Sequence, residues 1–145
     1  MELRWFDARF CELLPRQLYA IVQLRQRVFV VEQNCPYLDA DGLDVVSRHV
    51  WAEAASGLIR AYLRIVPPGA KYPEVSIGRV VTSTDARGCG LGRMLMSRAL
   101  ELAGAAPIRI AAQAHLQRFY RDFGFTSVGE VYEEDGIPHV EMFRA

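Results

Sequence analysis

The segment Val80–Arg93, VVTSTDARGCGLGR, decides the fold because it leads from an apolar strand through a polar, glycine-rich turn into a helix. Three glycines at alternate positions from Gly88 to Gly92 allow positive φ and close approach of the backbone to a ligand. Free N–H groups at the helix start, together with the helix dipole, favour an anion there. Arg87 and Arg93 can add charge-assisted hydrogen bonds to phosphate oxygens. The segment predicts a phosphate-binding loop, with a plain structural turn as the alternative.

Two familiar phosphate motifs fit this loop poorly. A Walker A loop needs Gly-Lys-Ser/Thr, whereas Gly92 is followed by Arg93 and Met94. The alternate glycines also lack GxGxxG spacing, and no βαβ unit with a later ribose-binding acid is evident. The glycines alone therefore do not name the ligand.

Hydrophobic periodicity outside the loop predicts a regular order of strands and helices. The expected strands are 3–6, 49–54, 58–66, 75–82, 108–112, 128–132 and 139–143, and the expected helices are 16–32, 90–103 and 116–123. This order of strand, helix, three strands, helix, strand, helix and two strands predicts an α/β (α+β) fold, with helices flanking one central, twisted mixed sheet. A single domain spanning 1–145 accommodates it.

Local signals refine this arrangement. Pro15 suits the first turn of the first helix, whose charges, Arg25 among them, are expected on the face away from the core. Gly78 marks a bulge or close-approach point within its strand. The dipeptide Asp135-Gly136 predicts the turn between the last two strands.

Composition narrows the classes of function. Hydrophobic residues make up 51% and charged residues 23%, which is the balance of a folded domain. Lys+Arg and Asp+Glu both number 17, so no global positive field gathers nucleic acid or anionic lipid. The N-terminus lacks the apolar core of a secretory signal, and no stretch approaches the ~20 apolar residues of a membrane span. We expect a cytoplasmic protein without nucleic-acid or membrane partners.

The cysteines and histidines do not suggest a metal site. They are few and scattered, without paired CxxC or helical HxxxH spacing, which predicts reduced thiols and no metal. The residues concerned are Cys11, Cys35, Cys89, His49, His115 and His139.

With these elements in place, Arg87–Gly92 resembles the Arg/Gln-x-x-Gly-x-Gly/Ala signature of the GNAT superfamily, between a strand and a long helix as in that family. The later stretch 113–125 resembles a second motif that ends in Tyr-x-x-x-Gly-Phe, although Gln113 stands where many members have Asn. The phrases FVVEQNCP at 29–36, QAHLQRFY at 113–120 and EVYEEDGIPH at 130–139 are similar to the ElaA-type branch. The likeness covers nearly the whole chain.

The resemblance implies an N-acetyltransferase that moves an acetyl group directly from acetyl-CoA to a primary amine of a small molecule or peptide. It implies that the strand before the loop lines the pantetheine arm, that the loop holds the pyrophosphate, and that one later polar residue contacts the cofactor. The implied cofactor-binding residues are Val80, Val81, Thr82, Arg87, Gly88, Cys89, Gly90, Leu91, Gly92, Arg93 and Gln113.

The transfer needs a proton for the departing thiolate and a charge-stabilising donor for the carbonyl oxygen. Tyr120 matches the family's tyrosine and is the expected acid, while its helical spacing with Leu116 and Phe123 would equally suit a core aromatic. In this family a backbone N–H near Val81 could polarise the thioester.

The base that deprotonates the amine stays open. Glu32 and His49 are the chosen candidates, with Glu133 and His139 beside them. Glu32 and the three aspartates of the segment 39–44 either attract a cationic substrate or belong to an ordinary solvated loop.

A non-catalytic acyl-CoA sensor is the alternative function, since the same phosphate loop would serve it. Turnover with amines would distinguish an acetyltransferase from such a sensor. A homodimer and the identity of the amine are left open by the sequence.

Overall fold

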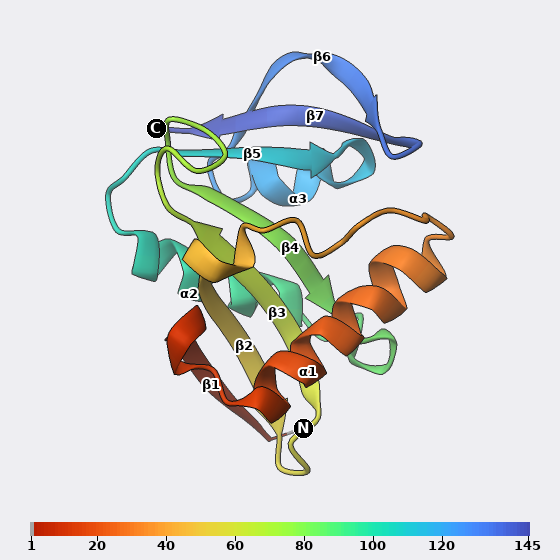
Figure 1. Cartoon of the computed structure of the whole chain (residues 1–145). Helices are drawn as coiled ribbons and strands as arrows, with labels where there is room; N and C mark the ends of the chain where they lie inside the picture. Colours follow the sequence, from red (N-terminus) through yellow and green to blue (C-terminus); the bar gives the residue numbers. More distant parts are fainter. Residues whose placement is uncertain (1) are drawn as a thin grey trace.

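Seven strands and three α-helices make up the computed structural model, which describes residues 2–145. The strands form two antiparallel sheets, in the orders β1-β2-β3-β4 and β5-β7-β6 (Figure 1). All seven predicted strands are present, most of them longer than predicted. Their bounds are β1 Leu3–Arg9, β2 Arg48–Ala54, β3 Ile59–Val66, β4 Ser76–Thr82, β5 Ile108–Gln113, β6 Thr126–Glu134 and β7 Ile137–Arg144.

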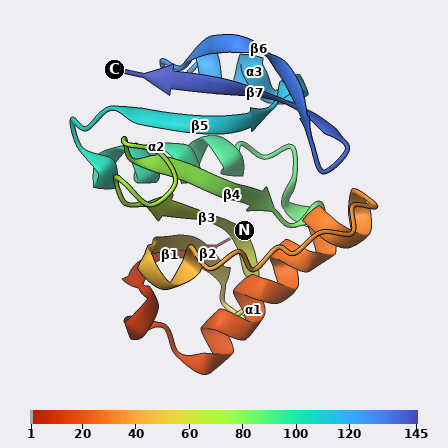
Figure 2. The same cartoon turned by 45° about the horizontal axis from the view of Figure 1, so that its top comes forward.

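The two sheets join at a parallel bridge between Val75 and Ile108. There the N–H of Arg109 donates to the carbonyl of Val75 over 2.9 Å. Within residues 2–145 no further pairing links β4 to β5, although these strands lie side by side (Figure 2). The predicted mixed sheet is therefore present as two antiparallel parts with one parallel contact. The unpaired edge of β4 leaves backbone groups available to a ligand.

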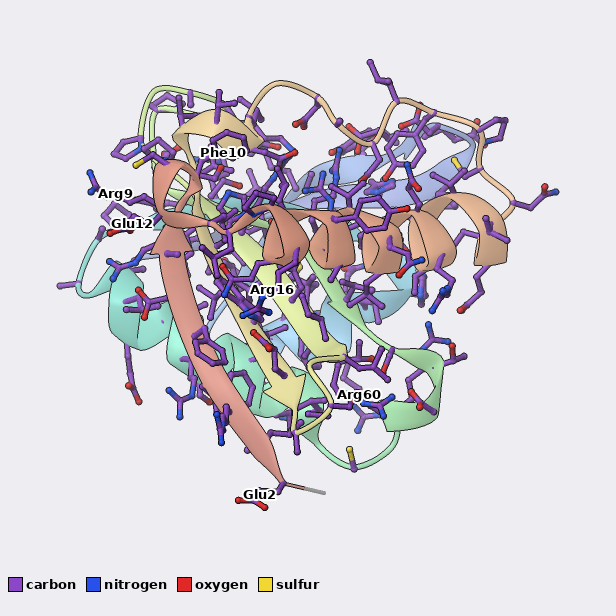
Figure 3. The ribbon with its side chains drawn as sticks, turned by 60° about the horizontal axis from the view of Figure 1, so that its bottom comes forward. Glu2, Arg9, Phe10, Glu12, Arg16 and Arg60 are labelled. Carbon is purple, nitrogen blue, oxygen red and sulfur yellow. The ribbon has the colours of Figure 1, made fainter. Side chains whose placement is uncertain are left out.

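Two helices cover the two faces of the four-stranded sheet, α1 Pro15–Arg25 on one and α2 Leu91–Ala103 on the other, while α3 Gln117–Arg121 packs against β5 and β6. Successive residues of β3 point to opposite faces, so Leu63 joins the core beneath α2 while Tyr62 joins a second core beneath α1. Figure 3 looks onto the face where α1 crosses the strands. Three of the predicted site residues, on β4, β5 and α3, lie where β4 and β5 separate between these layers.

The extent of the first helix matches its prediction, but the environment of Arg25 does not. It begins at Pro15 as expected, and from Gln26 to Glu32 it continues with π-helical hydrogen bonds (η2). The expectation that Arg25 lies on the exposed face is wrong, because its side chain is only 1% exposed. Arg25 is one turn from Ile21 and Val28, which are both buried. A charge in this position can remain only because acidic side chains reach it.

A bulge interrupts β4, as the sequence predicts, one residue beyond the expected position. The pairing of β3 with β4 shifts between Tyr62, opposite Val81, and Arg64, opposite Gly78. Arg79 takes a left-handed φ of 52°, whereas Gly78 does not have positive φ. The bulged residue is therefore an arginine, whose guanidinium is held by the ion pairs described below.

The last hairpin turns at the predicted dipeptide. Asp135 and Gly136 have φ of 53° and 78°, which suits a tight two-residue turn between β6 and β7. No helix in the described part of the chain is long and apolar enough to cross a membrane.

Candidate active site

The glycine-rich loop surrounds a cavity of about 240 Å³ at the N-terminus of α2. Gly90 caps that helix with φ of 79°, and Gly88 has φ of 84°. A Cβ atom built on either glycine would meet nothing within 4 Å, so the space beside the backbone is open to a ligand. The lining residues are Thr82, Ala86, Arg87, Gly88, Gly90, Leu91, Gly92, Arg93 and Phe119. The geometry is that of an anion-binding helix N-terminus.

The start of the loop is fixed to the sheet by an ion pair. Arg60 of β3, labelled in Figure 3, hydrogen-bonds to Asp85 in the short 3-10 helix η4 (Thr84–Ala86). Further along, the thiol of Cys89 donates to the carbonyl of Ala86 over 2.9 Å. These contacts hold the turn in shape independently of a ligand.

Both arginines of the loop are already paired with acids. Arg87 donates to the two carboxylate oxygens of Glu32 at 2.7 and 2.9 Å, and Arg93 pairs with Asp122 at 2.7 Å. Hydrogen bonding by Arg87 lowers the pKa of Glu32. Glu32 does not line the larger cavity described next. The position of Glu32 suits a residue that holds Arg87 in place, and it does not suit the predicted base.

A larger cavity, of about 390 Å³, lies on the other side of the β4–β5 junction. Its walls come from the segment 29–41, the strands β3 to β5, residues 116–120 and the β6–β7 hairpin. Four predicted residues line it, namely Val80, Gln113, Tyr120 and the candidate base His139. Thr82 instead lines the smaller cavity, and the Val81 side chain packs beneath α1, which leaves only its backbone for the site. β4 thus connects the two cavities.

Tyr120 reaches the larger cavity from α3 while its ring is held in the core. The residue is 7% exposed, and its ring packs edge-on against Phe119 and Phe125. Burial raises the pKa of Tyr120 to about 12. Within residues 2–145 its hydroxyl has no hydrogen-bond partner. Tyr120 is therefore a core aromatic whose protonated hydroxyl lies beside a cavity, and its role as the acid stays a prediction.

His49 lies away from both cavities. It is fully buried, with Nδ1 2.6 Å from the Tyr62 hydroxyl and Nε2 2.9 Å from the carbonyl of Asp44. Burial lowers the pKa of its imidazole. The expectation that His49 lies beside the cleft as a base is therefore replaced by a packing role, because both ring nitrogens are engaged.

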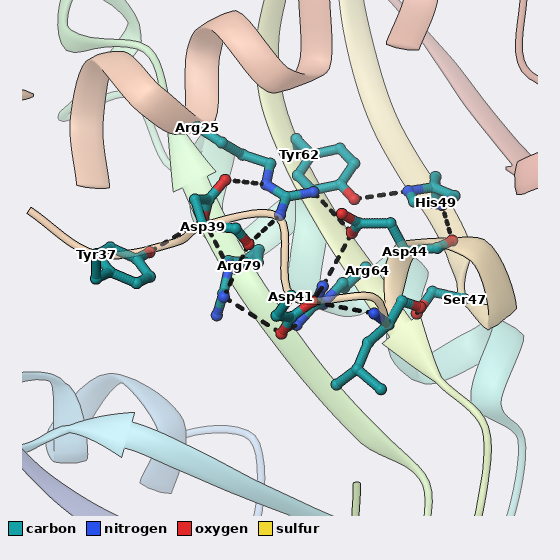
Figure 4. A network of polar contacts seen from close by, with 11 residues as sticks. Arg25, Tyr37, Asp39, Asp41, Asp44, Ser47, His49, Tyr62, Arg64 and Arg79 are labelled. Carbon is teal, nitrogen blue, oxygen red and sulfur yellow. Dashed lines mark hydrogen bonds and ion pairs between the residues drawn. The ribbon is translucent and has the colours of Figure 1, made fainter. Parts of the chain in front are cut away.

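The acidic segment forms a buried network with arginines (Figure 4). Arg25 binds Asp39 and Asp44 at 2.8 Å each, and Arg64 binds Asp44 at 2.9 Å. Arg64 also holds Asp41, and the bulged Arg79 lies 2.8 Å from Asp39. The segment is not an ordinary solvated loop, because its aspartates form internal ion pairs, and attraction of a cationic substrate stays a prediction.

The network changes the acidity of its members. Burial on its own would raise the pKa of Asp41, but hydrogen bonds and charge from Arg64 outweigh it and hold the net pKa well below the usual range. The pKa of Asp44 is lowered in the same way by Arg25 and Arg64. The periodicity gave a signal for this network, since Arg25 falls on the buried face of α1, but its partners are 14 and 19 residues later.

Known proteins resemble this chain in sequence and structure. The model of the acetyltransferase (GNAT) domain matches residues 47–144. Protein ElaA of Escherichia coli K12 is 48% identical over 98% of this chain and 96% of its own length. The chain belongs to the GNAT acetyltransferase family. Its ElaA-type resemblance is thereby confirmed.

Solved structures confirm the GNAT fold. An acyl-CoA N-acyltransferase from Pseudomonas aeruginosa superposes with a TM-score of 0.94 at 48% identity, covering 99% of this chain and all of that chain. Escherichia coli ElaA gives a TM-score of 0.92 at 46% identity, with 99% of this chain and 100% of that chain covered. Among residues 2–145 no group of three His, Cys, Asp or Glu side chains gathers as metal ligands would.

Proposed function

We propose that residues 1–145 act as one N-acetyltransferase domain, which transfers an acetyl group directly from acetyl-CoA to a primary amine. The observation that carries the proposal is the pair of cavities connected by β4. The smaller has the glycines and helix N-terminus that suit a pyrophosphate. The larger has Tyr120 and room for an acceptor.

In this proposal acetyl-CoA lies along the unpaired edge of β4. Its pyrophosphate contacts the loop from Arg87 to Arg93, with the predicted residues of that loop as ligands. Val80, Val81 and Thr82 face its pantetheine arm, and Gln113 lies at the far end of β5, within the larger cavity. A backbone N–H near Val81 polarises the thioester carbonyl.

The amine attacks the carbonyl carbon, a C–N bond forms and the C–S bond breaks. Tyr120 gives its proton to the departing sulfur, which its protonated state at neutral pH permits. No covalent intermediate on the protein is needed. The description of the similar Pseudomonas aeruginosa protein as an acyl-CoA N-acyltransferase supports the same chemistry.

The test measures release of the CoA thiol from acetyl-CoA with a panel of propylamine, benzylamine, spermidine and glycinamide, alongside calorimetric binding of acetyl-CoA. We expect binding, and turnover with at least one amine. Binding without turnover on any amine would favour the acyl-CoA sensor, and absence of binding would overturn the cofactor assignment.

A further inference from the structure

One histidine of the larger cavity has no role in the function proposed so far. His139, on β7 opposite Gln113 of β5, lines the same cavity as Tyr120. Its ring is largely buried, at 8% exposure, and stacks on the ring of Tyr132 with centroids 6.1 Å apart. The imidazole is thus held in one orientation beside the space for the acceptor.

The hydrogen bond of His139 fixes its tautomer. Nδ1 lies 2.7 Å from the carbonyl oxygen of Ile137. Because a carbonyl can only accept a hydrogen bond, Nδ1 carries the proton, and Nε2 of the neutral ring has a free lone pair. That nitrogen is the one that can receive a proton from a substrate.

An acid stands next to the free nitrogen. Nε2 of His139 is 3.6 Å from Oε2 of Glu134 in the adjoining strand β6. This is too long for a hydrogen bond between neutral groups, but close enough for the carboxylate to stabilise a positively charged imidazole. Glu134 is half exposed, at 48% of its side chain, so an incoming cation can also reach it.

Most of the remaining charges around the cavity are engaged elsewhere, whereas Lys71 lies close enough to Glu134 for their charges to interact. Arg64 and Arg79 are paired with aspartates of the buried network, Asp41 included, and Glu141 of β7 is 3.7 Å from Arg109. Lys71 forms no ion pair within residues 2–145, and Asp135 uses its carbonyl to accept a hydrogen bond from the Cys35 thiol. The charged groups that share the cavity with His139 are Asp41, Arg64, Lys71, Arg79, Glu134 and Asp135.

We propose that His139 is the general base that deprotonates the acceptor ammonium, and that Glu134 is the positioning residue that receives the ammonium and stabilises the protonated ring. The inference rests on the N-acetyltransferase function proposed above. It narrows the acceptor to an amine that arrives as a cation.

The protons balance over the reaction. One of the three ammonium protons passes to Nε2 of His139 and then to water, which frees the lone pair for attack on the thioester carbon. A second leaves the nitrogen as the tetrahedral intermediate collapses, and replaces the proton that Tyr120 gives to the sulfur. The third stays on the product amide. The net products are an N-acetyl amide, free CoA thiol and one proton.

The other candidates for the base do not match this geometry. Both ring nitrogens of His49 are engaged in the core, and Glu32 is bound by Arg87. Glu133 is exposed on β6 and is not part of the cavity wall. Because side chains alternate along a strand, Glu133 and Glu134 point to opposite faces.

The kinetic test uses His139→Asn, whose amide can still donate to the Ile137 carbonyl, and the panel amine with the highest turnover. At pH 7 we expect turnover to fall by about 10² to 10⁴-fold. The deficit should shrink as pH approaches the amine's own pKa, near ~10.4 for an alkylamine, because the acceptor then deprotonates in solution. A deficit that is the same at every pH, in a folded variant that binds acetyl-CoA, would overturn the proposal, as would near wild-type turnover.

Glu134→Gln tests the positioning residue, with Glu133→Gln as its matched control on the same strand. Loss of the Glu134 charge should raise the KM of the cationic amine more than it lowers kcat, since the ammonium loses the carboxylate that receives it. The Glu133 variant should keep the wild-type KM. An equal KM for all three proteins would remove Glu134 from the mechanism.

A measurement without substrate separates this inference from the proposed function. Long-range ¹H–¹⁵N NMR of the free protein, assigned by comparison with His139→Asn, should show the Nδ1–H tautomer of the neutral ring. An Nε2–H tautomer would overturn the assignment of His139 even if the protein is an active acetyltransferase. Failure of every amine in the panel would instead count against the proposed function.

Discussion

The two cavities differ in how the chain builds them. The smaller cavity comes almost entirely from one stretch, Thr82 to Arg93, with Phe119 as its only distant member among the described residues. The larger is assembled from segments as far apart as Phe29 and His139. A site made by neighbouring residues leaves a pattern in the sequence, whereas a site made by folding does not.

The two regions also keep their shape by different means. The loop depends on glycines in left-handed conformations, which is a local property of the backbone. One wall of the larger cavity depends on Arg64 and Arg79, whose partners come from the segment 39–44. We therefore expect mutations in the loop to affect cofactor binding first, and mutations in the network to affect stability first.

The largest effect should come from Tyr120→Phe, which keeps the ring packed against Phe119 and Phe125 but removes the hydroxyl. Turnover should fall by about 10² to 10⁴-fold, with little change in the dissociation constant of acetyl-CoA. Tyr19→Phe, an exposed change on α1, is the control. A variant that loses thermal stability but keeps its turnover would make Tyr120 a core residue only.

Asp44→Asn should destabilise the fold by about 3 kcal/mol, because the buried guanidinium groups of Arg25 and Arg64 lose the carboxylate that they share. Urea unfolding at pH 7 measures this. Asp7→Asn, in an exposed pair with Arg48, should cost no more than about 1 kcal/mol. Equal losses of stability in the two variants would show that the buried ion pairs contribute no more to the free energy of unfolding than an exposed pair does.

The effect of Asp44→Asn on the free energy of unfolding should depend on pH. Since the folded-state pKa values of Asp41 and Asp44 are lowered, their stabilisation is fully present above the ordinary carboxyl pKa near ~4 and is lost as pH falls through the lower folded-state values. The difference in unfolding free energy between wild type and Asp44→Asn should therefore shrink below about pH 4. A constant difference down to pH 2 would contradict this.

Gly90→Val should raise the dissociation constant of acetyl-CoA by about tenfold or more, since a branched side chain resists left-handed φ and fills the space beside the loop. Gly57→Val is the matched control: Gly57 has φ of 89° in the β2–β3 turn, with equally open surroundings. Both variants should lose similar stability, but only the first should lose affinity. Equal affinities would remove the loop from the cofactor site.

The smallest effect should come from Glu32→Gln. Freeing Arg87 from its carboxylate partner should tighten acetyl-CoA binding by up to about fivefold, which is the range of an exposed ion pair. Titration calorimetry measures the change, which should vanish when Arg87→Ala is also present. A loss of turnover of about 10²-fold would instead restore Glu32 as the base.

These contrasts explain what the sequence could predict. Periodicity located every strand and the three helices, and the loop from Arg87 to Arg93 carried its own signature. Arg25 was placed on the exposed face although Ile21 and Val28 share its side of the helix, because the partners that neutralise its charge lie 14 and 19 residues later. The sequence could not single out His139 among the candidate bases. Its tautomer and its contact with Glu134 are set only when β6 and β7 pair in the folded chain.

The most direct test of the two-cavity account is a crystal structure with acetyl-CoA bound. We expect the pyrophosphate over Gly88 to Gly92, the pantetheine arm along β4, and the thioester sulfur within hydrogen-bond reach of the Tyr120 hydroxyl. Density for the cofactor elsewhere, or a sulfur directed away from Tyr120, would contradict it.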